Sequence, residues 1–357
     1  MVFANELVGL FGVEADVAAI AVDYWQVMAL SLVVFVNSFA VSGILHGMGD
    51  TKTPMLANLA ANIINAVVAY GLIFGNWGFP EIGVVGSAWG AASGRVIAVG
   101  LMLGVLIFRG KIVSLSGRAG WLPRLPTLRD VGRIGIPSAI EQFSTSVAFA
   151  AMTAIVAVLG TESLAAHRIT FNALSLSFMP AFGMAMAATA LVGQATGAKD
   201  PASARRAARL SATYAAVWMG TIGVVYFVAG PQIMGLFSND PAVISQGGNS
   251  LRVLAFTQPF WAWMLVYSGA MRGIGKSRYP MVINSLTLWL TVILGYVLVS
   301  VLELGLPFIW SAFLVVSPWT ILLLRRRLMS DPLMSAGDEA PAEIEELAPE
   351  PDFKSAV

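Results

Sequence analysis

The amino-acid sequence predicts an all-α, polytopic membrane protein with about nine transmembrane helices. Hydrophobic residues make up 57% of the 357-residue chain, charged residues only 11%, and the mean hydropathy is +0.77. A soluble domain carries roughly 25% charged residues. Long segments such as Ala148–Gly160 and Leu286–Leu302 contain no charge, as a membrane span requires. The composition therefore excludes a soluble enzyme, a nucleic-acid-binding protein and a secreted module.

Apolar segments long enough to cross a bilayer recur along the whole chain. Helices are expected, because backbone groups in lipid must hydrogen-bond within their own segment. The predicted spans are 24–45, 55–75, 83–108, 131–159, 165–192, 204–236, 250–272, 280–302 and 304–325.

Apart from Arg95, Arg168, Arg252 and Lys354, the basic residues lie in every second junction between these spans. The basic junctions are His46–Pro54, Arg109–Arg133, Gly197–Arg209, Arg272–Arg278 and the exit Arg325–Arg327. The intervening junctions carry no Lys or Arg. Positive loops stay in the cytoplasm. We therefore expect a multi-pass protein of the cell (inner) membrane whose C-terminus is cytoplasmic, with residues 12–23 forming an exterior loop.

An internal repeat relates residues 9–58 to residues 235–284, with an offset of 226 (269 minus 43). Ser42-Gly43 matches Ser268-Gly269, Pro54-Met55 matches Pro280-Met281, and Asn58 matches Asn284. Six predicted spans separate the copies, so both face the same way and form a parallel repeat. On this pattern, roughly 95 residues with three helices are expected before Met1. The alternative is that nine spans form a whole, asymmetric protein.

Several motifs give the chain a specific resemblance. Leu164–Pro180 and Val192–Ala198 strongly resemble the eighth helix of the multidrug and toxic compound extrusion (MATE) family. Gly135–Pro137 resembles the start of its seventh helix, and Gly43–Pro54 and Gly269–Gly275 resemble the ends of its fourth and tenth. The resemblance covers about Gly9 to Arg327 and implies a MATE-like two-lobe bundle, N-terminally truncated relative to a twelve-helix member.

This resemblance implies a domain organisation. The expected parts are an incomplete N-lobe (1–108), a cytoplasmic inter-lobe linker (109–130), a complete six-helix C-lobe (131–327) and a disordered acidic tail (328–357). It also implies an antiporter that exports drugs or organic cations by alternating access, driven by H+ or Na+. We expect a monomer in the lipid bilayer that has small-molecule substrates, binds no nucleic acid and needs no further cofactor.

Glu141 is the first candidate for the coupling-cation or substrate site. It lies ten residues into the span 131–159, about 15 Å along a helix and so near mid-membrane. A buried acid can carry a proton, bind Na+ or neutralise a cationic drug. Gln142 and Thr145 supply polar groups nearby. Branches of the family place their acid at the position of Thr145, so only the helix face is shared with Glu141. A purely structural carboxylate is the alternative.

Other polar residues within spans are candidates for lining a cavity: Asn58, Asn62, Asn65, Arg95, Asn172 and Gln258. The asparagines could instead pack between helices, and Arg95 could instead bond to nearby polar groups. One branch of the family carries an Asp where Ala69 stands, which argues against proton coupling through the N-lobe. With no Cys and two His on separate segments, we predict neither a metal site nor catalysis.

Two other functions fit the sequence. A lipid-linked sugar flippase of the same superfamily would need a cavity lined by several arginines, and Arg95 is the one candidate for that role in this sequence. An inactive, truncated remnant is the other alternative. An intramembrane enzyme is disfavoured, because no second embedded acid or Ser–base pair accompanies Glu141.

Overall fold

The computed structural model of the chain describes residues 15–109 and 125–335. The chain divides into two compact units, Met1–Pro123 and Arg124–Val357. Helices account for nearly all of the described residues, and these residues contain no strand. The predicted all-α fold is confirmed.

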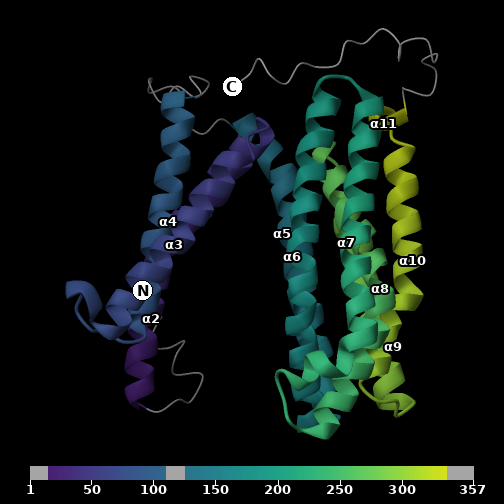
Figure 1. Cartoon of the computed structure of the whole chain (residues 1–357). Coiled ribbons are helices and arrows are strands. Elements are labelled where there is room, and N and C mark those ends of the chain that lie inside the picture. The colour runs from purple at the N-terminus through teal and green to yellow at the C-terminus, as the bar shows by residue number, and fades with distance from the viewer. Residues whose placement is uncertain (1–14, 110–124, 336–357) are drawn as a thin grey trace. The chain divides into compact units, whose positions relative to one another are not determined.

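The first unit contains α2 (Ala15–Gly47), α3 (Lys52–Phe74) and α4 (Val85–Gly104), with a π-helical turn at Val105–Arg109 (Figure 1). Glycines at every fourth position bring α4 against α3. A Cβ atom on Gly94 would lie only 2.6 Å from the carbonyl oxygen of Ala61. Such small residues let two helices in a membrane approach closely, where packing replaces the hydrophobic effect.

The second unit is a bundle of six long helices that run side by side (Figure 1). They are α5 (Leu125–Ala157), α6 (Thr161–Gly197), α7 (Pro201–Gly235), α8 (Pro241–Gly273), α9 (Arg278–Tyr296, extended by a π-helical segment Val297–Val301) and α10 (Pro307–Met329), followed by the short α11 (Pro332–Ser335). Helix α8 packs against α6, α7 and α10 and contributes Leu251, Leu254 and Trp261 to the core.

Eight of the nine long helices in the described ranges are long and apolar enough to cross a membrane. The exception, α8, also corresponds to a predicted span. It carries polar residues such as Gln246 and Asn249, and many of its residues are buried by neighbouring helices. A helix that is shielded from lipid needs fewer apolar residues. The chain is therefore a multi-pass membrane protein, with the nine predicted helices all present.

The internal repeat is reproduced in the helix boundaries and in the turn. Helices α2 and α8 both have 33 residues, and α3 begins 226 positions before α9 (278 minus 52). Gly49 and Gly275 both have a positive φ, of 87° and 77°. In both copies the same backbone bond, from Asp50 N to Leu45 O and from Lys276 N to Met271 O, measures 2.9 Å. The structure thus confirms the repeat.

Several predicted boundaries are wrong. The exterior loop expected at 12–23 is helical from Ala15 onward, since α2 starts there. The linker expected at 109–130 ends earlier, because α5 starts at Leu125. The tail expected to be disordered from residue 328 continues as α10 and α11 up to Ser335. Asp331 is fully buried and pairs with Lys276 in the α8–α9 turn. Residues 1–14, 110–124 and 336–357 lie outside the described part.

Basic residues of the second unit gather at one end of the bundle. One hollow is lined by Arg133 of α5, Lys276 of the α8–α9 turn and Arg327 of α10. Helix α11, next to the exit of α10, packs against α7 near the α6–α7 turn (Figure 1). We call this end the basic end. The predicted clustering of positive junctions on one side therefore holds within this unit.

Candidate functional site

A cavity of about 830 Å³ lies within the second unit. Three helices supply most of its wall, each through one face whose residues recur every three or four positions, as on one side of an α-helix. The lining residues are Ser138, Glu141, Gln142, Thr145, Ser146 and Phe149 of α5; Phe171, Leu174, Ser175, Phe178, Met179, Phe182, Ala185, Met186 and Thr189 of α6; Trp261, Met264, Leu265, Ser268, Gly269 and Arg272 of α8; and Asn284, Leu288 and Phe313 of α9 and α10.

Helices α6 and α8 approach each other closely at one end of this wall. The hydroxyl of Thr189 donates to the carbonyl oxygen of Gly269 at 2.9 Å, in addition to its own helix at Ala185. A Cβ atom on Gly269 would lie 2.5 Å from the carbonyl oxygen of Ala185. Glycine is therefore required here, and it fixes the spacing of the two helices that form the cavity.

Glu141 is the centre of a buried polar cluster at the edge of the cavity. Nη2 of Arg272 donates to its Oε2 at 2.8 Å, and Nδ2 of Asn284 donates to its Oε1 at 2.7 Å. Asn284 also donates to Oγ of Ser268 at 2.9 Å. The side chain of Glu141 is 10% exposed and that of Arg272 is 31% exposed. Each carboxylate oxygen thus has a donor, as a buried charge requires.

The partners of Glu141 place it relative to the neighbouring helices, whereas its depth in the membrane stays a prediction. Helix α5 starts six residues earlier than the predicted span, at Leu125 rather than 131. Glu141 contacts Arg272, in the last turn of α8, and Asn284, in the second turn of α9. The carboxylate therefore lies in the middle of α5 but near the ends of α8 and α9 that meet at the α8–α9 turn.

The rest of the cavity is apolar and rich in aromatic rings. Phe178 packs against Trp261 with ring centroids 5.1 Å apart, and Trp261 meets Phe313 edge-on at 4.8 Å. The thioether groups of three lining methionines add a surface that can adapt to different shapes. Of the described residues in this wall, only Glu141 and Arg272 carry charge. The site is an apolar chamber with one ion pair at its edge.

Gln142 and Thr145, predicted beside Glu141, do line the same cavity. The hydroxyl of Thr145 donates to the backbone oxygen of Glu141, four residues earlier in the same helix, at 2.8 Å. The oxygen of this hydroxyl can still accept a hydrogen bond. Gln142 is exposed on the cavity face. The structure therefore brings all three predicted residues to one site.

Gln258 does not line the cavity, and this prediction is wrong. Its side chain is fully buried, and its Oε1 accepts a 2.6 Å bond from the hydroxyl of Ser177 on α6. Gln258 therefore joins α8 to α6 within the core. Asn172 is exposed and lines a separate, smaller hollow with His167 and Arg168, and it does not border the main cavity. Gln258 lies one turn before Trp261 on the same face of α8 as the lining residues, so the helix period alone does not separate it from them.

The three predicted asparagines of the first unit lie along α3. Asn58 and Asn62 are exposed, and Nδ2 of Asn58 donates to the carbonyl oxygen of Pro54 at 2.8 Å. Asn65 is half-buried where α3 meets Gly94 of α4.

Arg95 ties α4 to α2. Its Nη1 donates to Oγ of Ser31 at 2.7 Å, and its guanidinium carbon lies 4.6 Å from the ring centroid of Phe35. These contacts bond Arg95 to nearby groups of the first unit, which is the arrangement that the competing interpretation describes.

Three residues of the polar cluster are absent from the predicted site: Ser268, Arg272 and Asn284. All three belong to the repeat, where they match Ser42, His46 and Asn58. The polar positions shared by both copies are therefore a usable signal. The charge pattern assigns Arg272 to the basic turn, although it lies in the last turn of α8.

No group of three His, Cys, Asp or Glu residues that could hold a metal ion occurs among residues 15–109 and 125–335. Glu141 is the one acid of the described cavity wall, and Arg272 and Asn284 each donate to one of its carboxylate oxygens.

The fold and the site define a helical, multi-pass membrane protein with an apolar chamber and an ion pair at the edge of that chamber. The sequence model described as MatE matches residues 1–71 and 137–297. These two segments end 226 positions apart (297 minus 71), the offset of the internal repeat. The chain belongs to the MatE family, which confirms the predicted resemblance.

The relatives carry consistent names. A "Probable multidrug resistance protein NorM" from Thermotoga maritima is 30% identical over 309 residues, which are 86% of this chain and 66% of that protein. One from Burkholderia mallei is 31% identical over 293 residues, or 80% of this chain and 62% of that protein. The chain thus spans less than two thirds of the length of these relatives.

Solved structures agree in fold. An outward-facing "multidrug resistance MATE family transporter of the MOP superfamily" is 22% identical, with a TM-score of 0.82 over 92% of this chain and 74% of that one. A MOP superfamily transporter from Pyrococcus furiosus, described as having reverse polarity of its binding pocket, is 21% identical, with a TM-score of 0.83 over the same shares of 92% and 74%. At this identity the likeness concerns the fold.

Proposed function

We propose that the chain works as a secondary antiporter that exports amphipathic drugs or organic cations in exchange for inward H+ or Na+. The observation that carries this proposal is the ion pair of Glu141 and Arg272 at the edge of an aromatic cavity. Family membership and the names of the relatives support the same function.

The cavity suits a substrate that is apolar with one cationic end. Its volume of about 830 Å³ falls in the range of small-molecule sites, roughly 300–1,000 Å³. Aromatic faces attract both apolar surface and cations. Glu141 supplies the one acid of the described wall, so a cationic group would dock beside it.

Coupling follows from competition for a single carboxylate. Arg272 already neutralises Glu141 in this structure. A coupling cation or a cationic drug that binds Glu141 must displace Arg272, and one negative charge cannot serve two cations at once. Alternate occupation by coupling ion and drug would then link their movements in opposite directions.

The full cycle would rely on alternating access, in which two lobes rock around a central site. With the basic junctions towards the cytoplasm, the chain would lie in the cell (inner) membrane with its C-terminus inside. The protein would act as a monomer and need no cofactor beyond the coupling ion.

A lipid-linked sugar flippase is the second candidate function. Such a protein would hold a diphosphate, for which several arginines are the suitable partners. Of the charged groups in the described wall only Arg272 is basic, and it is already paired with Glu141. This favours a drug or organic cation over a polyanionic lipid. The remaining alternative, an inactive remnant, is decided by the transport assay.

The test is transport by the purified 357-residue chain in liposomes, with ethidium as substrate and either a pH gradient or a Na+ gradient. We expect gradient-dependent ethidium movement that is lost in Glu141→Gln. Glu162→Gln is the matched control, because Glu162 is an exposed acid outside the cavity wall. No gradient-dependent movement by the wild-type chain, or full activity of Glu141→Gln, would contradict the proposal.

A further inference from the structure

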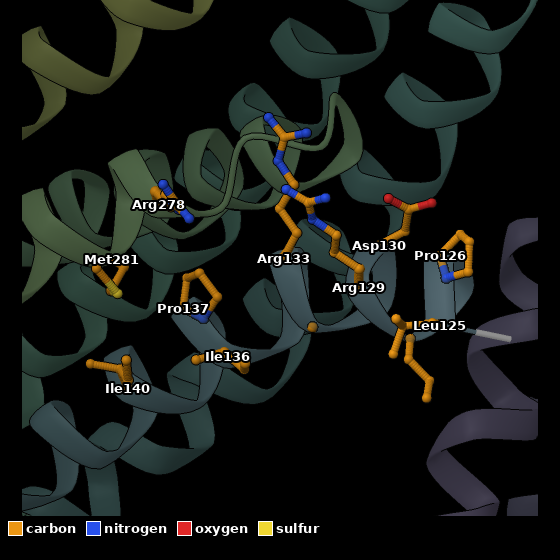
Figure 2. Close-up of a pocket in the computed structure, with 12 residues that line it drawn as sticks. Leu125, Pro126, Arg129, Asp130, Arg133, Ile136, Pro137, Ile140, Arg278 and Met281 are labelled. Carbon is orange, nitrogen blue, oxygen red and sulfur yellow. The ribbon is translucent and has the colours of Figure 1, made fainter. Parts of the chain in front are cut away.

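A second large hollow, of about 1080 Å³, lies on the second unit between α5 and α9, and the transport proposal does not use it. Its wall follows one face of α5, whose lining residues recur at helical spacing from Leu125 to Ile140, and two residues of α9, Arg278 and Met281. Figure 2 shows these side chains converging on the same groove from the two helices. We call it the α5–α9 groove.

The groove changes character along its length. Near the start of α5 and α9 it presents three exposed arginines, Arg129, Arg133 and Arg278. Deeper along α5 it presents Ile136 and Ile140, which are 62% and 51% exposed. In Figure 2 the arginines lie along one edge and the two isoleucines along the other. A basic end that leads into an apolar trough is complementary to a molecule with an anionic head and a hydrocarbon chain.

The arginines have no partner among the described residues that would neutralise them. Two ion pairs of the second unit join Arg272 to Glu141 and Lys276 to Asp331, and neither involves an arginine of the groove. The groove itself contains one acid, Asp130, against three arginines, which leaves a net charge of +2. In Figure 2 the Asp130 carboxylate lies on the Pro126 side of Arg129, away from Arg278.

The positive charge also continues beyond the groove. Arg133 and Arg278 line the adjoining hollow too, together with Lys276 and Arg327. This is the basic end of the bundle, and clustered basic residues at the end of membrane helices favour contact with anionic phosphate groups. Basic pockets between membrane helices at this level bind anionic lipid headgroups.

We propose that the α5–α9 groove is a binding site for an anionic phospholipid. Its phosphate is held by Arg129, Arg133 and Arg278, and one acyl chain lies along Ile136 and Ile140. Charge complementarity selects an anionic headgroup over a zwitterionic one, and the exposed apolar trough selects a lipid over a free phosphate. The site is separate from the cavity around Glu141, since no residue lines both.

The test measures lipid binding by the full chain in detergent, with no gradient and no drug, so its outcome is independent of the proposed transport. The probes are dioleoylphosphatidylglycerol, dioleoylphosphatidylcholine and inorganic phosphate, and retention is followed by native mass spectrometry. We compare the wild type with the triple variant Arg129→Gln, Arg133→Gln, Arg278→Gln. The control triple Arg206→Gln, Arg209→Gln, Arg326→Gln removes as many charges outside the groove.

We expect the wild type and the control triple to hold phosphatidylglycerol about tenfold or more tightly than phosphatidylcholine, and the groove triple to lose this preference. A further variant, Ile136→Ser with Ile140→Ser, should weaken the binding of dioleoylphosphatidylglycerol. It should not weaken the binding of the dihexanoyl analogue, whose short acyl chains make less use of the apolar trough. If the triple variant does not fold, Arg278→Gln alone must lower the preference. If both triple variants lose the preference for phosphatidylglycerol equally, the lipid is attracted by the surface charge in general, and the proposal is overturned. Equal binding of the two lipids, or displacement of the lipid by inorganic phosphate at millimolar concentration, would also overturn it.

Discussion

Arg272 and Glu141 lie 131 positions apart in the sequence, yet Nη2 of Arg272 donates to Oε2 of Glu141 at 2.8 Å. The pair joins the last turn of α8 to the middle of α5, and Asn284 of α9 completes the carboxylate's shell. Three helices of the second unit are thereby held together at one acid. The ion pair has consequences for stability as well as for transport.

Removing either partner of this pair should destabilise the protein, and removing both should cost less than the sum of the two losses. Arg272→Gln leaves a nearly buried charge on Glu141, whereas Glu141→Gln leaves a charge on a side chain that is 31% exposed. We expect a coupling free energy of about 1 kcal/mol, reduced from the buried-pair range by the exposure of Arg272. Thermal unfolding of the purified single and double variants measures it. Strict additivity would mean that the pair contributes nothing to stability.

The sequence predicts the acid but not its partners. Glu141 is conspicuous because an embedded carboxylate stands out among apolar residues. Arg272 is the last residue of the predicted span 250–272 and is counted with the basic junction Arg272–Arg278, although helix α8 continues to Gly273. Only the tertiary packing of α5 against α9 brings Asn284 to the same acid.

The close contact of α6 and α8 predicts opposite effects for two glycines. Gly269→Ala should destabilise the protein by about 1–3 kcal/mol, because the new methyl group would lie 2.5 Å from the carbonyl oxygen of Ala185. Gly43 holds the same position in the first copy of the repeat, and a methyl group added there would meet no described atom within 4 Å. Gly43→Ala should therefore be neutral, or stabilising by up to about 1 kcal/mol.

The measurement is the thermal unfolding midpoint of the two variants in the same detergent. Ethidium binding to Gly269→Ala gives a second readout, since a wider gap between α6 and α8 changes the cavity wall. Equal midpoints for Gly269→Ala and Gly43→Ala would show that the helices can separate without cost.

Helix starts illustrate a second limit of sequence reasoning. The spans predicted to begin at 24 and 250 begin as helices at Ala15 and Pro241, nine residues earlier in both copies. The added segments carry polar residues such as Asp23 and Asn249, which lower the hydropathy without breaking a helix. Asp240 caps α8 by accepting a 2.8 Å hydrogen bond from Ala242 N. An Asp followed by Pro is typical of a helix start, so this boundary could have been predicted from the sequence.

The contact of Lys276 with Asp331 predicts an asymmetry between its two partners. Lys276 is 39% exposed on its side chain, whereas Asp331 is fully buried. Lys276→Met would strand a buried carboxylate and should cost about 3 kcal/mol. Asp331→Asn would leave an ammonium group that water can reach, and should cost about 1 kcal/mol.

Thermal unfolding of both single variants, and of the double variant as a control, tests this asymmetry. The double variant should be more stable than Lys276→Met alone, because it carries no stranded charge. A larger loss for Asp331→Asn than for Lys276→Met would contradict the interpretation of a buried acid that requires its partner.

Asp200 is the N-terminal cap of α7, and its charge should make the stability of the protein depend on pH. It is the residue before Pro201, and its Oδ1 accepts a 2.9 Å bond from Ser203 N at the start of the helix. Hydrogen bonds from the Ser203 side chain and then from its backbone hold the pKa of Asp200 below its ordinary value of 3.8. Because the folded-state pKa is the lower one, the charged cap stabilises the protein above pH 3.8 and is lost as the pH falls through the lowered value.

Asp200→Ala should therefore cost about 1 kcal/mol at pH 7, and its difference from the wild type should shrink as the pH falls below about 4. The thermal midpoints of both proteins between about pH 7 and pH 3 give this difference directly. Ser203→Ala is the control: it removes the hydroxyl donor but keeps the backbone N–H, so the pKa of Asp200 moves back towards its ordinary value and the loss sets in at higher pH. A difference between wild type and Asp200→Ala that grows on acidification would mean that the carboxylate is stabilised in its protonated form, which its bonds to Ser203 do not allow.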